Sequence, residues 1–172
     1  VATAEQGADI DAFSKDVAFN VVDDAQDVID EMTAHNEIAS AQTITVSGVA
    51  TAAQGVAINE FTKDVAFNVV DDANDIAAEL SGSNDQLDEA VSVTVTGGTV
   101  DVADAAAIQG ISGYVDSTAS SYDIVDSASA IVGATDAILN TGGVATVTVS
   151  GVATAEQGAD IDAFIQDVTY NV

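Results

Sequence analysis

The stretch TITVSGVATAAQGVAINEFTKDVAFNVVDDANDIAAEL, residues 43–80, decides the fold because it holds two successive strand-then-helix patterns. The alternating run TITVS precedes a helical run that begins at Thr51, and the run AFNVV precedes a helical run that begins at Asp71 or Asp72. Each half changes from a period of two to a helical period within a few residues, which is typical of a βα unit. Strands that alternate with helices in this way are expected to be parallel.

The rest of the chain repeats this unit. By subtraction, the first helical runs of successive units are 48, 53 and 50 residues apart, because they are expected to begin at Thr3, Thr51, Asp104 and Thr154. We therefore expect one repetitive domain, residues 1–172, whose approximate repeats are 1–42, 43–91, 92–145 and a partial 146–172.

The first residues of the chain return at its end. Residues 1–21 (VATAEQGADIDAFSKDVAFNV) reappear as residues 152–172 (VATAEQGADIDAFIQDVTYNV). The two copies differ only at the pairs Ser14/Ile165, Lys15/Gln166, Ala18/Thr169 and Phe19/Tyr170. We interpret the sequence either as a window of a longer array or as a protomer whose two ends continue one another.

The fold class predicted from this repetition is α/β. We expect a right-handed βα solenoid with parallel strands on one face, short helices on the other, and about two βα rungs per repeat of 48–53 residues. A doubly wound flat sheet is the alternative, but it needs a change of strand order that strict repetition does not suggest. Alternation predicts that the helices cover Ile44, Val46, Phe67 and Val69, and that the other face carries Thr43, Thr45, Ser47 and Asn68.

Two kinds of helix start recur. The first has a threonine followed three residues later by glutamine, which predicts capping boxes at Thr3, Thr51 and Thr154. A glycine follows each glutamine and permits close approach to a neighbouring rung, at Gly7, Gly55 and Gly158. The spacing i, i+3, i+7 then predicts a buried face formed by Ile10/Phe13/Val17, Ile58/Phe61/Val65 and Ile161/Phe164/Val168.

The second kind of helix start is acidic. Asp24 with Asp27, and Asp72 with Asp75, place carboxylates at the cap and in the first turn, where the helix dipole favours negative charge. A third helix of this kind is expected after Asp126 and Ser127.

One copy of the unit diverges from the others. It predicts a strand at residues 92–96, a turn at Gly97 and Gly98, and a shortened helix at residues 104–111. The two strands that follow are expected at 122–125 and 146–150.

Composition excludes several functions. Two Lys+Arg against 29 Asp+Glu give a formal net charge of -27, so nucleic acid and anionic membrane surfaces would be repelled. The absence of cysteine excludes disulfides and thiolate metal sites and fits export. No apolar run is long enough for a membrane helix, and the first residues lack the pattern of a signal peptide, so a secretion signal would lie outside this sequence.

The sequence does not predict an enzyme. His35 is the only histidine and lies in a polar connection, so it cannot form a triad or a metal cluster alone. Lys15 and Lys63 are the only cations, which leaves almost no candidates for activating a nucleophile or stabilising an oxyanion.

The paired aspartates also suggest calcium. Calcium takes six to eight oxygen ligands, often from carboxylates that converge on one loop. The candidate ligands are Asp23, Asp24, Asp71, Asp72 and Asp126, although helix capping explains the same residues. Outward threonines on the strands, such as Thr43 and Thr45, leave glycan or ice binding as further alternatives.

The pattern FNVVDDANDI at residues 67–76, with YDIVDSASAI at residues 122–131, resembles the repeats of large, acidic, cysteine-free bacterial surface proteins. These include repeat-containing adhesins and type I secreted proteins. The resemblance implies an extracellular structural or adhesive role. The Gly-Gly-x-Gly-x-Asp calcium repeats of one such group are absent, because residues 97–101 (GGTVD) match them only in part.

Together these observations predict a structural protein of the cell surface or extracellular space, without a cofactor other than calcium. Its expected partners are copies of itself, end to end, and another surface polymer or glycan. A binding module for calcium, glycan or ice is the second hypothesis.

Overall fold

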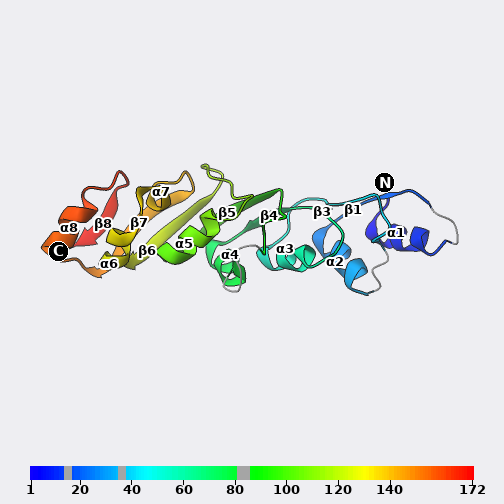
Figure 1. Cartoon of the computed structure of the whole chain (residues 1–172), viewed down its shortest axis with the longest axis horizontal. Helices are drawn as coiled ribbons and strands as arrows, with labels where there is room; N and C mark the ends of the chain where they lie inside the picture. The colour runs from blue at the N-terminus through cyan, green and yellow to red at the C-terminus, as the bar shows by residue number, and fades with distance from the viewer. Residues whose placement is uncertain (14–16, 35–37, 81–85) are drawn as a thin grey trace.

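The structure is a computed structural model of an α/β protein, and it describes residues 1–13, 17–34, 38–80 and 86–172. Helices and strands alternate along an elongated molecule, and the chain passes from one end to the other in sequence order (Figure 1). The helices of the described residues are α1 (Ala4–Asp11), α2 (Ala25–Ala34), α3 (Ala52–Asn59), α4 (Ala73–Leu80), α5 (Val102–Gln109), α6 (Ala128–Gly133), α7 (Asp136–Leu139) and α8 (Ala155–Ile161).

The described strands form two parallel sheets. One has the order β1-β2-β3 and the other the order β4-β5-β6-β7-β8, so strands that follow one another in sequence pair in space. The strands are β1 (Asn20–Asp23), β2 (Thr43–Val46), β3 (Val65–Ala66), β4 (Asn68–Asp71), β5 (Ser92–Val100), β6 (Ser121–Ser127), β7 (Val144–Val152) and β8 (Val168–Asn171).

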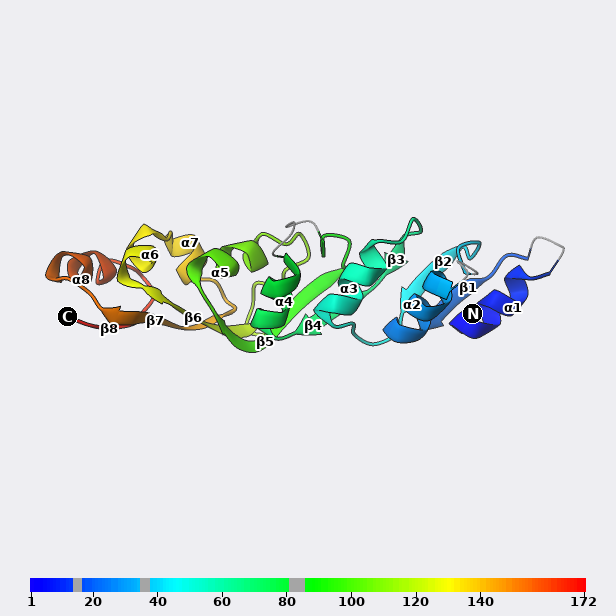
Figure 2. The same cartoon turned by 90° about the horizontal axis from the view of Figure 1, so that it is seen from below.

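The core lies between the strands and the row of helices that Figure 2 shows in front of them. The alternation predicted for the strands is confirmed, because Ile44, Val46, Phe67 and Val69 are all buried. On the opposite face Thr43 and Ser47 are exposed, and Thr45 and Asn68 are half-buried.

The predicted helix starts with threonine are confirmed. The hydroxyl of Thr51 accepts a hydrogen bond from the Gln54 backbone N–H at 3.2 Å, and the Gln54 side chain accepts one from the Thr51 N–H at 3.1 Å. The same capping box is present at Thr3 and at Thr154. Each box satisfies two backbone donors that the first turn of a helix leaves unpaired.

The glycines that follow these capping boxes allow the close packing that the sequence predicts. A Cβ atom on Gly55 would lie 2.9 Å from Leu87 Cδ2 and 3.0 Å from Val69 Cγ2. A Cβ atom on Gly7 would meet Ile38 and Val21 at 3.0 and 2.9 Å. These helices therefore rest directly on the strand that follows them and on an apolar residue further along the chain, Ile38 for α1 and Leu87 for α3.

The strand predicted at residues 66–70 is divided. Val65 and Ala66 pair with β2, whereas β4 begins at Asn68 and pairs with β5. Gly48, after β2, has a φ of +86°, and Ala50 beyond it forms a separate parallel bridge to Val69 of β4.

The predicted turn at Gly97 and Gly98 is wrong. Strand β5 continues through both glycines, which have φ of +100° and +91°, and its register with β6 shifts between Thr96 and Thr99. A Cβ on Gly98 would lie 2.6 Å from Asp72 Oδ1, so the bulge leaves room for this carboxylate.

The helix predicted from Asp104 begins earlier, at Val102. Asp101 is its N-cap and accepts from the Asp104 N–H at 2.8 Å, in the place that threonine has in the other units. The helix expected after Ser127 is divided into α6 and α7, because Ala134 has an extended backbone.

The predicted apolar triads are correct only in part. Helices α1 and α3 end one residue after their isoleucine and α8 ends at its isoleucine, so the phenylalanine and valine of each triad lie beyond the helix. Phe61 is half-buried and Val65 buried, but Phe13 is 66% exposed and Val17 46% exposed.

No described helix combines the length and the apolar character that crossing a bilayer requires.

Candidate functional site

The acidic residues at the ends of the strands form a recurring contact between elements. Asp23 Oδ2 accepts a hydrogen bond from the Ala4 N–H, and Asp71 Oδ2 accepts one from the Ala52 N–H, both at 2.8 Å. Asp126 Oδ2 accepts from the Val102 N–H at 3.1 Å. Each carboxylate on a strand therefore holds the first residue of the helix that precedes it in the chain.

The second oxygen of each of these carboxylates is also engaged. It accepts from the N–H of the next residue, at 3.0 Å for Asp23, 3.0 Å for Asp71 and 2.6 Å for Asp126. Because the first turn of a helix has unpaired N–H donors and a positive dipole end, a carboxylate at this position satisfies both. The three residues thus have a structural role that explains why they recur.

The neighbouring aspartates cap the next helices, as the sequence predicts. Asp24 Oδ1 accepts from the Asp27 N–H at 3.0 Å. Asp72 Oδ1 accepts from both nitrogens of Asn74, the backbone at 2.8 Å and the side chain at 2.7 Å.

The five predicted calcium ligands do not converge on one point, because they lie in or directly after three different strands, β1, β4 and β6. Among the described residues, one set of three carboxylates, Asp23, Asp24 and Asp27, has oxygen atoms within 4.8 Å of one another. It lies beside a hollow of about 350 Å³ lined by Thr3, Glu5, Asp23, Asp27, Asp30 and Glu31. We call the set Asp23, Asp24 and Asp27 the acidic cluster. Its carboxylates are close enough together to contact a single ion.

The pKa of Asp27 is raised above its ordinary value of 3.8, first by the charge of Asp24, then by burial and by the charge of Asp23. A raised pKa means that the charged carboxylate destabilises the folded state. This destabilisation is present above the folded pKa and is relieved as the pH falls through it toward the ordinary value.

We therefore expect Asp27→Asn to raise the melting temperature at pH 7 and low salt. The difference from the unchanged protein should shrink as the pH falls through the raised pKa of Asp27 toward 3.8, and it should be absent below that value. Added salt should also reduce the difference, because it screens the cluster. Thermal unfolding followed by circular dichroism measures it. The matched control is Asp75→Asn at the same position of α4, where Asp72 accepts two hydrogen bonds from Asn74. An equal rise in melting temperature for this variant would contradict the view that repulsion within the acidic cluster is the cause.

A further set of carboxylates, which the sequence did not reveal, joins segments that are 24 to 29 residues apart in the chain. Asp88 Oδ1 accepts from the Ser112 N–H at 3.0 Å, and Asp116 Oδ1 from the Gly142 N–H at 2.6 Å. Asp136 accepts from the Ile165 N–H at 3.3 Å, and Asp11 from the Ser40 hydroxyl. The spacing differs among them, with 24, 26 and twice 29 residues between the partners, and no shared motif marks the aspartates.

The outer face of the sheet makes hydrogen bonds between its own strands. The Thr146 hydroxyl donates to Asp123 Oδ1 at 2.6 Å, and the Ser92 hydroxyl donates to Asn68 Oδ1 at 2.8 Å. Some groups that could contact a glycan or ice are therefore already paired within the molecule.

Of the residues considered for catalysis, the structure describes one. His35 and Lys15 lie outside the described residues, and Lys63 is half-buried in the segment before β3. Comparison of the chain with protein-family models, with curated proteins and with solved structures found no match in any of the three.

Proposed function

We propose that this chain is a structural protein, a segment of a self-associating or continuous extracellular filament, surface layer or adhesin stalk, built as a right-handed βα solenoid. The observation that carries the proposal is the strand order, in which strands that are successive in sequence are paired and parallel within each sheet. Such a stack grows by adding rungs.

The repeated local contacts support the same role. Capping boxes recur at the starts of α1, α3 and α8, and the strand-end aspartates make the same pair of hydrogen bonds in three rungs. Side-chain contacts also cross between rungs: Gln54 Nε2 of α3 donates to Gln26 Oε1 of α2 at 3.4 Å, and Gln157 of α8 donates to Ser129 of α6 at 3.0 Å. Rungs with equivalent contacts can be stacked without a special partner at each junction.

Composition supports an extracellular, non-catalytic setting. A chain without cysteine depends on no redox state, and a net charge of -27 keeps neighbouring filaments apart in solution. Its partners would be copies of itself, together with another surface polymer or a glycan.

A calcium-binding module is the second candidate, and the acidic cluster is the observation that favours it. A bound divalent ion would neutralise the repulsion among Asp23, Asp24 and Asp27. Waters and the residues that line the hollow beside them would supply further oxygen ligands. Glycan or ice binding by the Thr/Asn face has no comparable cluster in its favour.

Electron microscopy of the purified chain tests the proposal, first with calcium and then with a chelator. We expect thin filaments whose width matches one molecule, in both conditions. If chelation removed the filaments of the unchanged protein, and if filaments of an Asp24→Asn variant did not respond to calcium, the acidic cluster would be a metal site. Discrete single molecules under both conditions would contradict the structural role and direct attention to the Thr/Asn face.

A further inference from the structure

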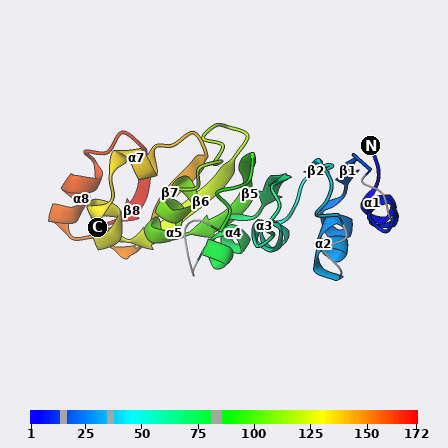
Figure 3. The same cartoon turned by 45° about the vertical axis from the view of Figure 1, so that its right-hand side comes forward.

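The outer face of the sheet, on the side away from the helices, repeats one pair of residues. Three times a valine on one strand is opposite a threonine on the next: Val22 and Thr45, Val70 and Thr94, and Val125 and Thr148. The residue before each of the six is buried, so all six point away from the core. The later members lie on β5, β6 and β7, which Figure 3 shows side by side.

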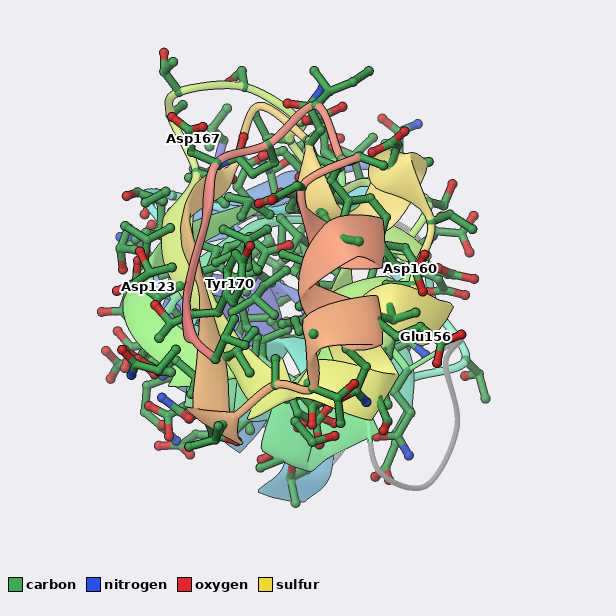
Figure 4. All side chains as sticks on the ribbon, turned by 90° about the vertical axis from the view of Figure 1, so that its left-hand side faces the viewer. Asp123, Glu156, Asp160, Asp167 and Tyr170 are labelled. Atoms are coloured by element: carbon green, nitrogen blue, oxygen red, sulfur yellow. The ribbon has the colours of Figure 1, made fainter. Side chains whose placement is uncertain are left out.

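This outer face carries almost none of the charge of the chain. The sequence has 29 Asp+Glu. Along β1 to β7, the described side chains that face away from the helices are valine, threonine, serine, asparagine and alanine, with Asp123 as the one acidic residue among them. The strand-end aspartates point the other way, because they accept hydrogen bonds from the first turns of helices. Figure 4, which looks along the molecule, shows Asp123 on one side and Glu156 and Asp160 of α8 on the other.

Polar groups of this face already have partners within the molecule. The hydroxyls of Thr146 and Ser92 donate to Asp123 and Asn68 on the neighbouring strands. A polar group that keeps its hydrogen bond loses little when water is removed from it. Short β-branched side chains also lose little conformational freedom when they are covered. The face is therefore suited to pack against another protein surface, as two sheets do at a separation of about 10 Å.

Two opposite charges lie at separate places on this surface. Lys63, the one lysine or arginine that the structure describes, is half-buried and lies two residues before β3. It lines a hollow of about 580 Å³ together with Thr43, Thr45, Asp64 and Ala66. Asp123 is on β6. Strand β5 lies between the two, because it pairs on one side with β4, which follows β3 in the chain, and on the other with β6.

We propose that two copies of this chain pack their outer faces together as an antiparallel pair, with Asp123 of each copy against Lys63 of the other. A two-fold axis that crosses β5 places β6 of one copy over β3 of its partner, and the symmetry makes the same contact twice. On this face two chains of charge -27 meet with few carboxylates opposed. The pairing goes beyond the proposed function, because it is lateral and requires no association of chain ends.

Salt concentration should control the pairing. The acidic groups on the helix sides of the two copies repel one another over a long range, and this repulsion is screened beyond about 10 Å at 0.1 M ionic strength. Burial of the valines and the short contacts between the faces persist when salt is added. We therefore expect single molecules at low salt and pairs at higher salt, and filaments one molecule wide should then become two molecules wide.

An exchange of the two charges tests the proposal, with sedimentation velocity of the full chain measured at several protein and salt concentrations. Asp123→Lys changes the net charge by +2, from -27 to -25, so general repulsion falls. We nevertheless expect its dissociation constant to rise at least about tenfold, because lysines then oppose each other at both contacts. Lys63→Glu should weaken pairing similarly. Asp123→Lys/Lys63→Glu keeps the net charge at -27 and should restore the dissociation constant to within about threefold of the original.

Asp160→Lys is the matched control, because it makes the same charge change at an exposed position of α8, on the helix side. Its dissociation constant should be unchanged or slightly lower. Circular dichroism checks that each variant folds. Single molecules at every concentration, or a double variant that pairs no better than the single variants, would overturn the pairing. Filaments that stay one molecule wide at all salt concentrations would do so while leaving the proposed function intact, whereas pairs without filaments would support the pairing and contradict that function.

Discussion

Replacing Asp71 by alanine is expected to lower the free energy of unfolding by about 1.5–3 kcal/mol, because a charged acceptor of a partly buried N–H is removed. The Ala52 N–H would lose its partner on a residue that is fully buried, and the Asp72 N–H would lose one as well. The start of α3 would then no longer be tied to the end of β4. Urea unfolding followed by circular dichroism measures the change.

The control for Asp71 must remove the same charge without this contact. Asp64→Ala is suitable because Asp64 is exposed and lies in the segment before β3. Losing one of many negative charges should leave its stability unchanged or slightly raised. Asp71→Asn keeps one acceptor oxygen and should fall between the two. Equal stability of Asp71→Ala and Asp64→Ala would refute the role assigned to the strand-end aspartates.

Replacing Gly55 by valine is expected to destabilise the protein by about 1–3 kcal/mol, as overpacking of a filled core does. The new Cβ alone would lie 2.9 Å from Leu87 Cδ2, 3.0 Å from Val69 Cγ2 and 3.2 Å from Phe67 Cε2. All three neighbours are buried, so α3 must move away from β4 and the next rung. Urea unfolding measures this change too.

Gly133→Val in α6 is the matched control, because a Cβ there meets nothing within 4 Å. Removing a glycine from a helix usually gains a few tenths of a kcal/mol, so this variant should be neutral or slightly more stable. If Gly55→Val behaved in the same way, the contact of α3 with Leu87 would not be a determinant of rung spacing.

Much of the fold was predictable because the information is local. A threonine with a glutamine three residues later specifies a capping box, and Ile44 alternating with Thr43 and Thr45 specifies which face of the strand is buried. The aspartate caps of α2 and α4 were predictable for the same reason, since a cap and its donor are only a few residues apart.

The features that were missed depend on contacts between rungs. Gly97 and Gly98 suggest a turn, but the strand continues because a bulge there accommodates Asp72 from the preceding rung. The exposure of Phe13 follows from which element is beside it and not from its own periodicity. The contact of Asp71 with Ala52 also joins two different elements. The same separation of 19 residues is found between Asp23 and Ala4, and this shared spacing could have indicated the contact in the sequence.

The candidate site was predictable only as a set of residue types. The sequence pointed to Asp23, Asp24, Asp71, Asp72 and Asp126, and the structure brings the first two together with Asp27. The sequence did not predict that backbone N–H groups donate hydrogen bonds to the strand-end carboxylates. These bonds depend on where each helix starts relative to the strand beside it.

The order of the strands has a mechanical consequence. Strands that are successive in sequence pair with one another, and the elements follow one another along the long axis of the molecule (Figure 1). The hydrogen bonds between strands therefore lie roughly in the direction of a force that pulls the two ends apart. Such bonds open one after another and do not all shear at once. Each rung of about 24 residues would then release roughly 80 Å of extended chain, so tension would be absorbed stepwise, with the remaining rungs still folded.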